Sequence, residues 1–138
     1  MSIVDRLVAA VSGEDIDAFG ALYADDAVLI EPLYPEPVRG KEAIMEGEKG
    51  LLRAFSEVSI DVRNEVSFGR GIIAELVLSA TNDGPLDLGE GDVPATGRRV
   101  QIPMVWVLEV NDEGLVKEER DYFDTALIMR QLGLDEGA

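Results

Sequence analysis

The chain has 138 residues, with 28 acidic and 12 basic side chains, no histidine and no cysteine, which gives a net charge of −16. The missing cysteine excludes disulfides and thiolate metal sites. The missing histidine removes the commonest general base and the usual zinc ligand. A surface this acidic repels phosphate backbones, so we expect no nucleic-acid partner. Any catalysis must use carboxylates, phenols, amides, indole, lysine or arginine.

The length predicts a single domain over residues 1–138. The N-terminal apolar segment MSIVDRLVAAV is too short for a signal peptide, and an acidic residue occurs too early in it. No apolar run approaches the ~20 residues that a membrane span requires. We therefore expect a cytoplasmic protein without a membrane segment.

The first part of the chain shows helical periodicity. Apolar residues at helical spacing predict a helix over residues 2–12, and Asp15 can cap a second helix that runs through Ala24. A short strand is expected over residues 27–31, before a proline-rich stretch that favours a stiff loop. Gly40 precedes a third helix that extends to about Phe55.

The period then changes from 3.6 to 2, which is typical of strands. Strands are predicted over residues 58–68, 72–81, 96–110 and 115–125, with a short helix that ends at residues 132–133. Helices followed by an antiparallel meander predict an α+β fold in which one sheet face lies under the helices. The opposite face still carries an apolar strip, which favours a homodimer: Val77, Val105, Val107 and Tyr122.

Several stretches of the chain resemble known families. Residues 21–28 (ALYADDAV), Glu31-Pro32 and residues 39–44 (RGKEAI) resemble the opening half of ketosteroid isomerase. The end of the chain is similar to SnoaL-type polyketide cyclases and limonene epoxide hydrolase, through residues 114–116 (GLV), 119–124 (ERDYFD) and 131–134 (QLGL). These families belong to the nuclear transport factor 2-like superfamily, and the resemblance covers nearly the whole chain apart from residues 82–95. It implies a cone: a curved antiparallel sheet wrapped around three N-terminal helices, with a cavity at the wide end.

The resemblance points to two catalytic carboxylates. Glu31 matches the Asp-Pro carboxylate that serves ketosteroid isomerase as its base, and burial in an apolar pocket would suit it to proton transfer. Asp121 matches the aspartate that lines the cavity of the cyclases and the epoxide hydrolase as acid or base. The alternatives are a strand-end carboxylate turned to water for Glu31, and an edge salt bridge with Arg120 or Lys117 for Asp121.

Other residues are candidates for contact with a substrate. Trp106 matches the position of the hydrogen-bond-donating acid of ketosteroid isomerase, although it is equally suited to a core position. Asn64 interrupts an apolar strand face and is either a polar group of the pocket or a bulge residue. Tyr34 either covers the pocket mouth or is exposed. Apolar side chains are expected to desolvate the carboxylates: Leu29, Leu76, Leu78, Met104 and Phe123.

The chain also departs from both families. Leu7 stands where ketosteroid isomerase carries a tyrosine, so steroid isomerisation is disfavoured. Leu76 and Leu78 occupy the positions of an Asp–Arg pair of the epoxide hydrolase, so epoxide opening by that residue set is disfavoured. The acidic, glycine-rich loop over residues 82–92 is interpreted as a hairpin tip or lid, because it lacks the ligand spacing of a calcium loop. No metal and no cofactor are expected.

We therefore expect a cofactor-independent acid–base catalyst of isomerase or cyclase type, acting on a small, mostly apolar carbonyl or enol compound. The alternatives are a non-catalytic protein that binds a small apolar ligand, and a hydrolase with an altered residue set. Both carboxylates facing one cavity would favour catalysis, whereas a carboxylate in solvent would favour binding.

Overall fold

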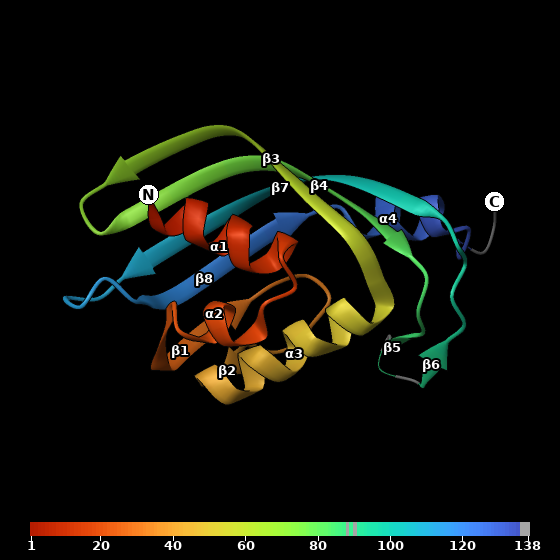
Figure 1. The fold of residues 1–138 in the computed structure, drawn as a ribbon, viewed down its shortest axis with the longest axis horizontal. Helices are drawn as coiled ribbons and strands as arrows, with labels where there is room; N and C mark the ends of the chain where they lie inside the picture. Colours follow the sequence, from red (N-terminus) through yellow and green to blue (C-terminus); the bar gives the residue numbers. More distant parts are fainter. Residues whose placement is uncertain (88, 90, 136–138) are drawn as a thin grey trace.

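Figure 1 shows the computed structural model, which describes residues 1–87, 89 and 91–135. The N-terminal part contains α1 (Ile3–Ser12), α2 (Ile16–Gly20), β1 (Tyr23–Ile30), β2 (Val38–Arg39) and α3 (Lys41–Ala54). The remainder contains β3 (Phe55–Phe68), β4 (Gly71–Asn82), β5 (Leu86–Asp87), β6 (Asp92–Val93), β7 (Arg99–Val110), β8 (Val116–Phe123) and α4 (Thr125–Leu132). No helix of these described residues is long and apolar enough to cross a membrane.

Over the described residues, the main sheet has the strand order β2-β1-β8-β7-β4-β3. Its neighbouring strands are antiparallel except β1 and β8, which pair in parallel. The sheet is curved, and α1, α2 and α3 lie along its concave side (Figure 1). The predicted α+β architecture, a curved and mainly antiparallel sheet around N-terminal helices, is therefore confirmed.

The helix starts follow from their capping residues. Ser2 accepts a hydrogen bond from the Asp5 amide, and the Asp5 carboxylate accepts one from the Ser2 amide, which forms a capping box at α1. The Asp15 side chain caps α2 by accepting a hydrogen bond from the Ala18 amide at 3.0 Å. Both caps leave the apolar face of each helix turned toward the sheet.

The second helix is shorter than the sequence predicts. It ends at Gly20, and β1 begins at Tyr23 rather than at Ala27. The Val116 amide donates to the Leu22 carbonyl at 2.9 Å, and Tyr23 pairs with Val116 of β8. Pairing with the last strand therefore outweighs the local helical pattern in this segment.

The core fills the space between the helices and the concave face of the sheet. α1 contributes Ile3, Val4, Leu7 and Ala10, at the spacing of one helix face. They pack with strand residues of the same cluster, including Ala74, Leu108 and Val116, each of which is fully buried. A second cluster lies where α4 meets β7, around Ala80, Val100, Ile102 and Leu132. The region between the two clusters contains the cavity described below.

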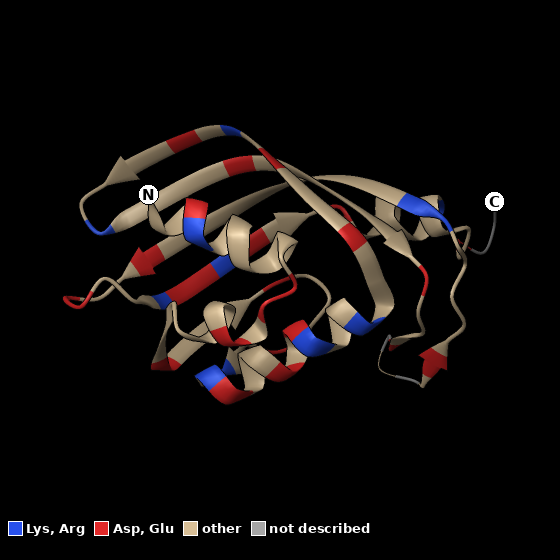
Figure 2. Cartoon of the chain, viewed as in Figure 1, with Lys and Arg blue, Asp and Glu red and all other residues tan. Residues whose placement is uncertain are grey.

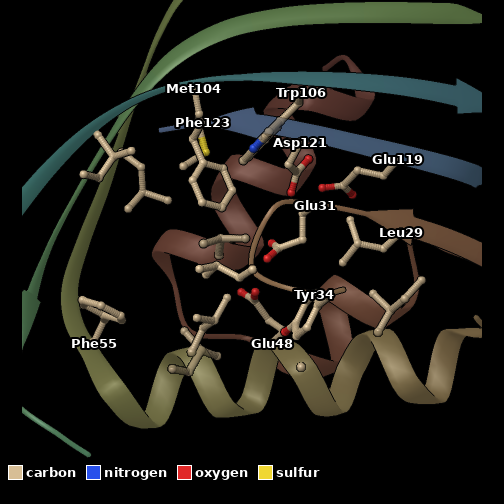
Figure 3. A pocket seen from close by; sticks show the side chains of 18 of the residues that line it. Leu29, Glu31, Tyr34, Glu48, Phe55, Met104, Trp106, Glu119, Asp121 and Phe123 are labelled. Carbon is tan, nitrogen blue, oxygen red and sulfur yellow. The ribbon is translucent and has the colours of Figure 1, made fainter. Parts of the chain in front are cut away.

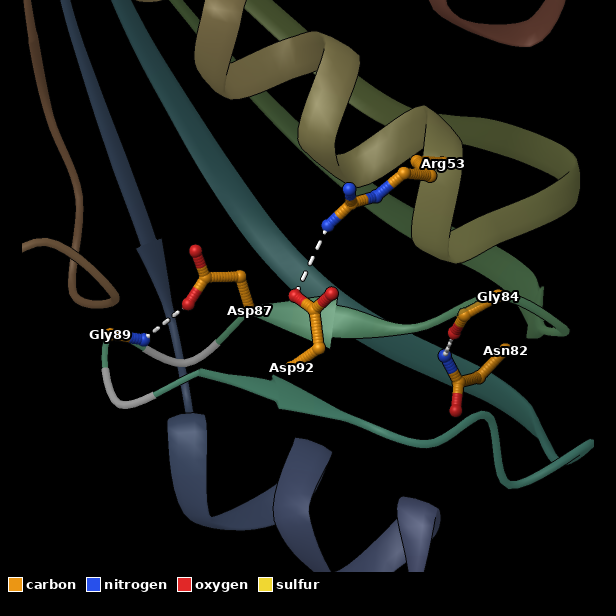
Figure 4. A network of polar contacts seen from close by, with 6 residues as sticks. All are labelled: Arg53, Asn82, Gly84, Asp87, Gly89 and Asp92. Carbon is orange, nitrogen blue, oxygen red and sulfur yellow. Dashed lines mark hydrogen bonds and ion pairs between the residues drawn. The ribbon is translucent and has the colours of Figure 1, made fainter.

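Within the segment interpreted as a hairpin tip or lid, β5 pairs with β6 in an antiparallel arrangement. The buried Asn82 anchors its base: its amide nitrogen donates to the Ala54 and Gly84 carbonyls at 3.0 and 3.1 Å, and its amide oxygen accepts from Thr96 (Figure 4). Arg53 of α3 pairs with Asp92 at 3.2 Å. Leu88 and Glu90, which the predicted loop includes, lie outside the described residues.

Candidate active site

A cavity of about 170 Å³ lies between the concave face of the sheet and helices α1, α3 and α4 (Figure 3). Most of its lining is apolar and comes from every layer of the fold, including Leu7 of α1, Leu29 of β1, Leu52 of α3 and Met104 of β7. Of the described residues that line it, the polar ones are four carboxylic acids, two phenols and one indole: Glu31, Glu48, Glu119, Asp121, Tyr23, Tyr34 and Trp106. The site is thus an apolar space with a small set of acidic groups.

The parallel pairing of β1 with β8 brings the two predicted catalytic carboxylates together. Leu29 pairs with Glu119, and Glu31 and Asp121 each follow two residues later on the same face of their strands. Asp121 is also the pairing partner of Trp106 on β7. In Figure 3, Glu31 and Asp121 both point into the cavity.

Both carboxyls are desolvated. Glu31 is 9% exposed, and one oxygen each of Glu31 (Oε1) and Asp121 (Oδ1) is buried without a hydrogen-bond partner. Burial raises the pKa of Glu31 to about 7, with a further increase from the charge of Glu119 and a decrease from the Leu33 backbone amide. Arg120 pairs with Glu118 rather than with Asp121, so the edge salt bridge considered for Asp121 does not form.

Glu119 and Tyr23 form a polar pair behind Asp121. The Tyr23 hydroxyl donates to Glu119 Oε1, and both side chains are buried. Burial, the charge of Glu119 and a hydrogen bond with Glu119 hold the pKa of Asp121 well above its ordinary value. Burial and the charge of Glu119 also raise the pKa of Tyr23, so its hydroxyl remains a donor. Asp121 is therefore biased toward its protonated form, and its neighbour Glu119 also accepts a hydrogen bond from Tyr23.

Glu48 and Tyr34 complete the polar lining from the helix side. Burial, with the charges of Glu119 and Glu31, raises the pKa of Glu48 to about 7. The Tyr34 amide donates to the Glu31 carbonyl at 3.2 Å, which turns the proline loop back over the cavity. The Tyr34 ring lies against Gly47, where an added Cβ would come within 2.8 Å of its hydroxyl. Tyr34 is half-buried and lines the cavity.

The remaining predicted contact residues divide into two groups. The lining of the cavity includes Leu29, Leu78, Met104, Trp106 and Phe123. Two predictions of cavity contact are wrong. Leu76 lies on the inner face but is packed in the core beside the cavity. Asn64 is exposed and donates to Glu75 Oε1 at 2.9 Å, because a register shift between Val62 and Asn64 turns it outward, as the bulge alternative required.

The sequence reasoning missed Glu48, and it named Glu119 and Tyr23 without assigning them to a site. For Glu48 a signal exists: it follows Ile44 by four residues and precedes Leu52 by four, so it lies on the apolar face of α3. For Tyr23 the signal was hidden, because its segment was interpreted as helix rather than strand.

A comparison with protein families identifies the chain. The model of the SnoaL-like domain matches residues 4–119. The chain belongs to the SnoaL-like family. The matched span of this SnoaL-like chain includes Glu31, Glu48 and Glu119 and ends two residues before Asp121.

Solved structures agree with the fold. A protein described as a SnoaL-like polyketide cyclase from Jannaschia sp. CCS1 is 23% identical, with a TM-score of 0.83 over 97% of this chain and 91% of that one. A protein of ketosteroid isomerase-like fold from Catenulispora acidiphila, in complex with trimethylamine, is 20% identical, with a TM-score of 0.78 over 96% and 93%. An epoxide hydrolase from M. tuberculosis is 21% identical, with a TM-score of 0.71 over 94% and 86%. The SnoaL-like chain therefore has the nuclear transport factor 2-like fold.

Proposed function

We propose that this protein is a cofactor-independent acid–base catalyst of isomerase or cyclase type, acting on a small, mostly apolar carbonyl or enol compound. The observation that carries this proposal is the convergence of Glu31 and Asp121 on one apolar cavity, each with a buried carboxyl oxygen that has no hydrogen-bond partner. Groups of this kind are enriched at catalytic sites, because the same desolvation that is unfavourable for folding adjusts the pKa for proton transfer.

The two carboxyls support complementary roles. Glu31, with a pKa of about 7, is partly ionised at neutral pH and can remove a proton from the carbon next to a carbonyl. Asp121, whose pKa is raised well above its ordinary value, can in its protonated form donate to the carbonyl oxygen as that oxygen gains negative charge. The C–H bond breaks, Glu31 takes the proton, and the electron pair forms the enol. Return of the proton at another carbon gives isomerisation, and attack of the enol on a second carbonyl gives ring closure.

Catalysis is favoured over binding without turnover because both carboxyls face the same cavity and neither opens onto solvent on another face. The solved structures include proteins described as polyketide cyclases and an epoxide hydrolase, which supports a cyclase or isomerase type of chemistry. One of them contains bound trimethylamine, which supports a cavity for a small ligand.

The test uses proton exchange, so it does not require the natural product. The protein is incubated in D₂O with a panel of small cyclic ketones and β-diketones, and deuterium incorporation next to the carbonyl is followed by NMR. We expect at least one ketone to exchange faster than in buffer, with saturation as its concentration rises. A panel with no protein-dependent exchange would contradict the proposal.

We also propose that two copies associate through the outer face of the sheet. This face carries Val77, Pro103, Val105 and Tyr122 around a shallow hollow, and Tyr122 is 53% exposed. Arg63 and Glu75 border the same hollow, so this face carries both signs of charge even though each copy has a net charge of −16.

Sedimentation at micromolar concentration should give twice the 15.0 kDa mass of one chain. Tyr122→Glu should shift the protein to a monomer, because it places a charge in the centre of the apolar face. Phe68→Glu is the matched control, since Phe68 is 52% exposed but lies at the end of β3, outside the hollow. A wild-type monomer, or dissociation by both variants, would reject this interface.

A further inference from the structure

The acid–base proposal uses two of the carboxyl groups around the cavity and leaves Glu48 without a role. Figure 3 shows Glu48 on α3, with Glu31 lying between it and the β8 residues Glu119 and Asp121. A carboxyl at this position does not help to form the core, because desolvation and two neighbouring acids all disfavour its charge. Its presence therefore needs another explanation, and a ligand is the natural one.

Among the described residues, none of the four cavity acids forms an ion pair with a basic side chain. The ion pairs found among the described residues join other carboxylates, at the surface: Lys41 with Asp25, Lys49 with Glu46, Arg53 with Asp92, Arg63 with Asp61, Arg70 with Asp112 and Arg120 with Glu118. The cavity lining, so far as the structure describes it, includes no lysine and no arginine. Figure 2 shows the basic residues scattered over several helices, strands and loops rather than gathered in one place. The cavity thus contains four acidic groups and no basic group among its described lining residues, so any of these acids that ionises lacks a protein counter-ion there.

Two further features make this site suitable for a cation. Glu31 lines the cavity and is 9% exposed, and its Oε1 is buried without a hydrogen-bond partner, as is Oδ1 of Asp121. Aromatic side chains surround the acids, including Tyr34 beside Glu48 and Trp106 beside Asp121. Aromatic faces attract cations, most strongly where water is excluded, and quaternary ammonium groups are the ligands most often bound in this way.

We infer that the ligand of this cavity carries an organic cation, a quaternary or protonated amine, whose positive charge lies against Glu48 and Tyr34 while its reactive end faces Glu31 and Asp121. This inference names the substrate class of the proposed active site and rests on the proposed function for the role of the reactive end. An organic cation fits better than a metal ion, because the acids of the described residues are not grouped closely enough to hold one.

A cation in this position should release protons from the protein. Glu48 and Glu31 have pKa values raised to about 7, and a neighbouring positive charge favours their ionised form. The titratable groups that face Glu48 are Glu31 and Tyr34 from the proline loop, Glu119 and Asp121 from β8, and Tyr23 from β1. All of them are acids, so cation binding should strengthen as the pH rises through about 7.

The test compares choline with neohexanol, its uncharged analogue in which a carbon replaces the nitrogen. Both are titrated calorimetrically into the wild-type protein at about pH 6 and pH 8, in buffers of different ionisation enthalpy. At the higher pH we expect choline to bind about tenfold or more tighter than neohexanol, which corresponds to about 1.4 kcal/mol. Choline binding should be accompanied by release of protons, and its affinity should be lower at about pH 6 than at about pH 8. Neohexanol binding should release no protons, and its affinity should not depend on pH.

Glu48→Gln should weaken choline binding about tenfold and leave neohexanol binding within about twofold. Glu46→Gln is the matched control, because Glu46 lies on the same helix but is exposed and pairs with Lys49. Equal or tighter binding of neohexanol to the wild-type protein would overturn the inference, as would equal weakening by both variants. Displacement of choline by millimolar Ca²⁺, but not by Na⁺, would reassign the acids to metal binding.

Ketone deuteration on the same preparation separates this inference from the proposed function. A preference for choline without exchange would reject acid–base catalysis and keep the cationic ligand. Exchange without a preference for choline would keep the catalyst and reject the cationic ligand.

Discussion

Replacing Glu31 by Gln is expected to lower the rate of protein-dependent ketone deuteration by about 10²–10⁴-fold. The amide has the shape of the carboxyl but cannot accept the proton that leaves carbon. The rate is measured by NMR in D₂O at saturating ketone.

Glu36→Gln serves as the control, because Glu36 is an exposed residue of the same proline loop and its replacement changes the net charge equally. It should exchange ketones at the wild-type rate. The Glu31→Gln protein should still bind the ketone, so its loss should fall on kcat rather than on KM. An active Glu31→Gln protein would remove this carboxyl from the mechanism.

Asp121→Asn should also slow the reaction, although by a different route. Asparagine can donate a hydrogen bond to the carbonyl oxygen and to Glu119, but it cannot deliver a proton. The pH profile separates the two residues. The wild-type rate should rise as Glu31 ionises, with a midpoint near 7, and this rise should persist in Asp121→Asn. If the increase of rate with pH disappeared in Asp121→Asn, Asp121 would be the base and Glu31 the acid.

The fold could be predicted from the sequence where the hydrophobic period is long and regular. The helical spacing of Ile3, Leu7 and Val11 and the alternation along β7 each specify one structure, and both are confirmed. The segment from Leu22 to Ala24 was misassigned because its local pattern also suits a helix. Its strand conformation depends on pairing with Val116, more than ninety positions later in the chain. Local periodicity contains no information about such a partner.

The candidate site was predictable in part for the same reason. Glu31 and Asp121 stand in short motifs that resemble known families, so their position in one cavity could be anticipated. Glu48 lies in no such motif, and its importance follows only from the packing of α3 across from β8. Asn64 was predicted to line the cavity, but its side chain is exposed. A single bulge reverses the faces of a strand, and alternation alone cannot locate that bulge.

The stability of the folded protein is expected to fall as the pH rises from about 4.5 to about 7. Folding raises the pKa of Glu31 from 4.5 to about 7, so within this window the unfolded chain releases a proton that the folded protein retains. The free energy of unfolding therefore decreases through the window and receives no further change from Glu31 above it. The full effect for a shift of this size is on the order of 3 kcal/mol, since each pKa unit corresponds to about 1.4 kcal/mol. Glu48 and Asp121 act in the same direction.

Glu31→Gln should remove this penalty, because the amide is neutral at every pH. Urea unfolding at about pH 8 should show the variant to be more stable than the wild type by on the order of 2 kcal/mol, and at about pH 4.5 the two should agree. The Glu36→Gln control should stay within about 0.5 kcal/mol of the wild type at both pH values, because Glu36 is exposed. A general relief of acidic repulsion would instead stabilise both variants alike. A variant that is inactive yet more stable only at high pH would mean that the wild-type fold retains a destabilising carboxylate at the position where the proposed chemistry needs a base. Equal stability of all three proteins at pH 8 would instead mean that Glu31 is solvated in solution, and its pKa could then not support the proposed proton transfer.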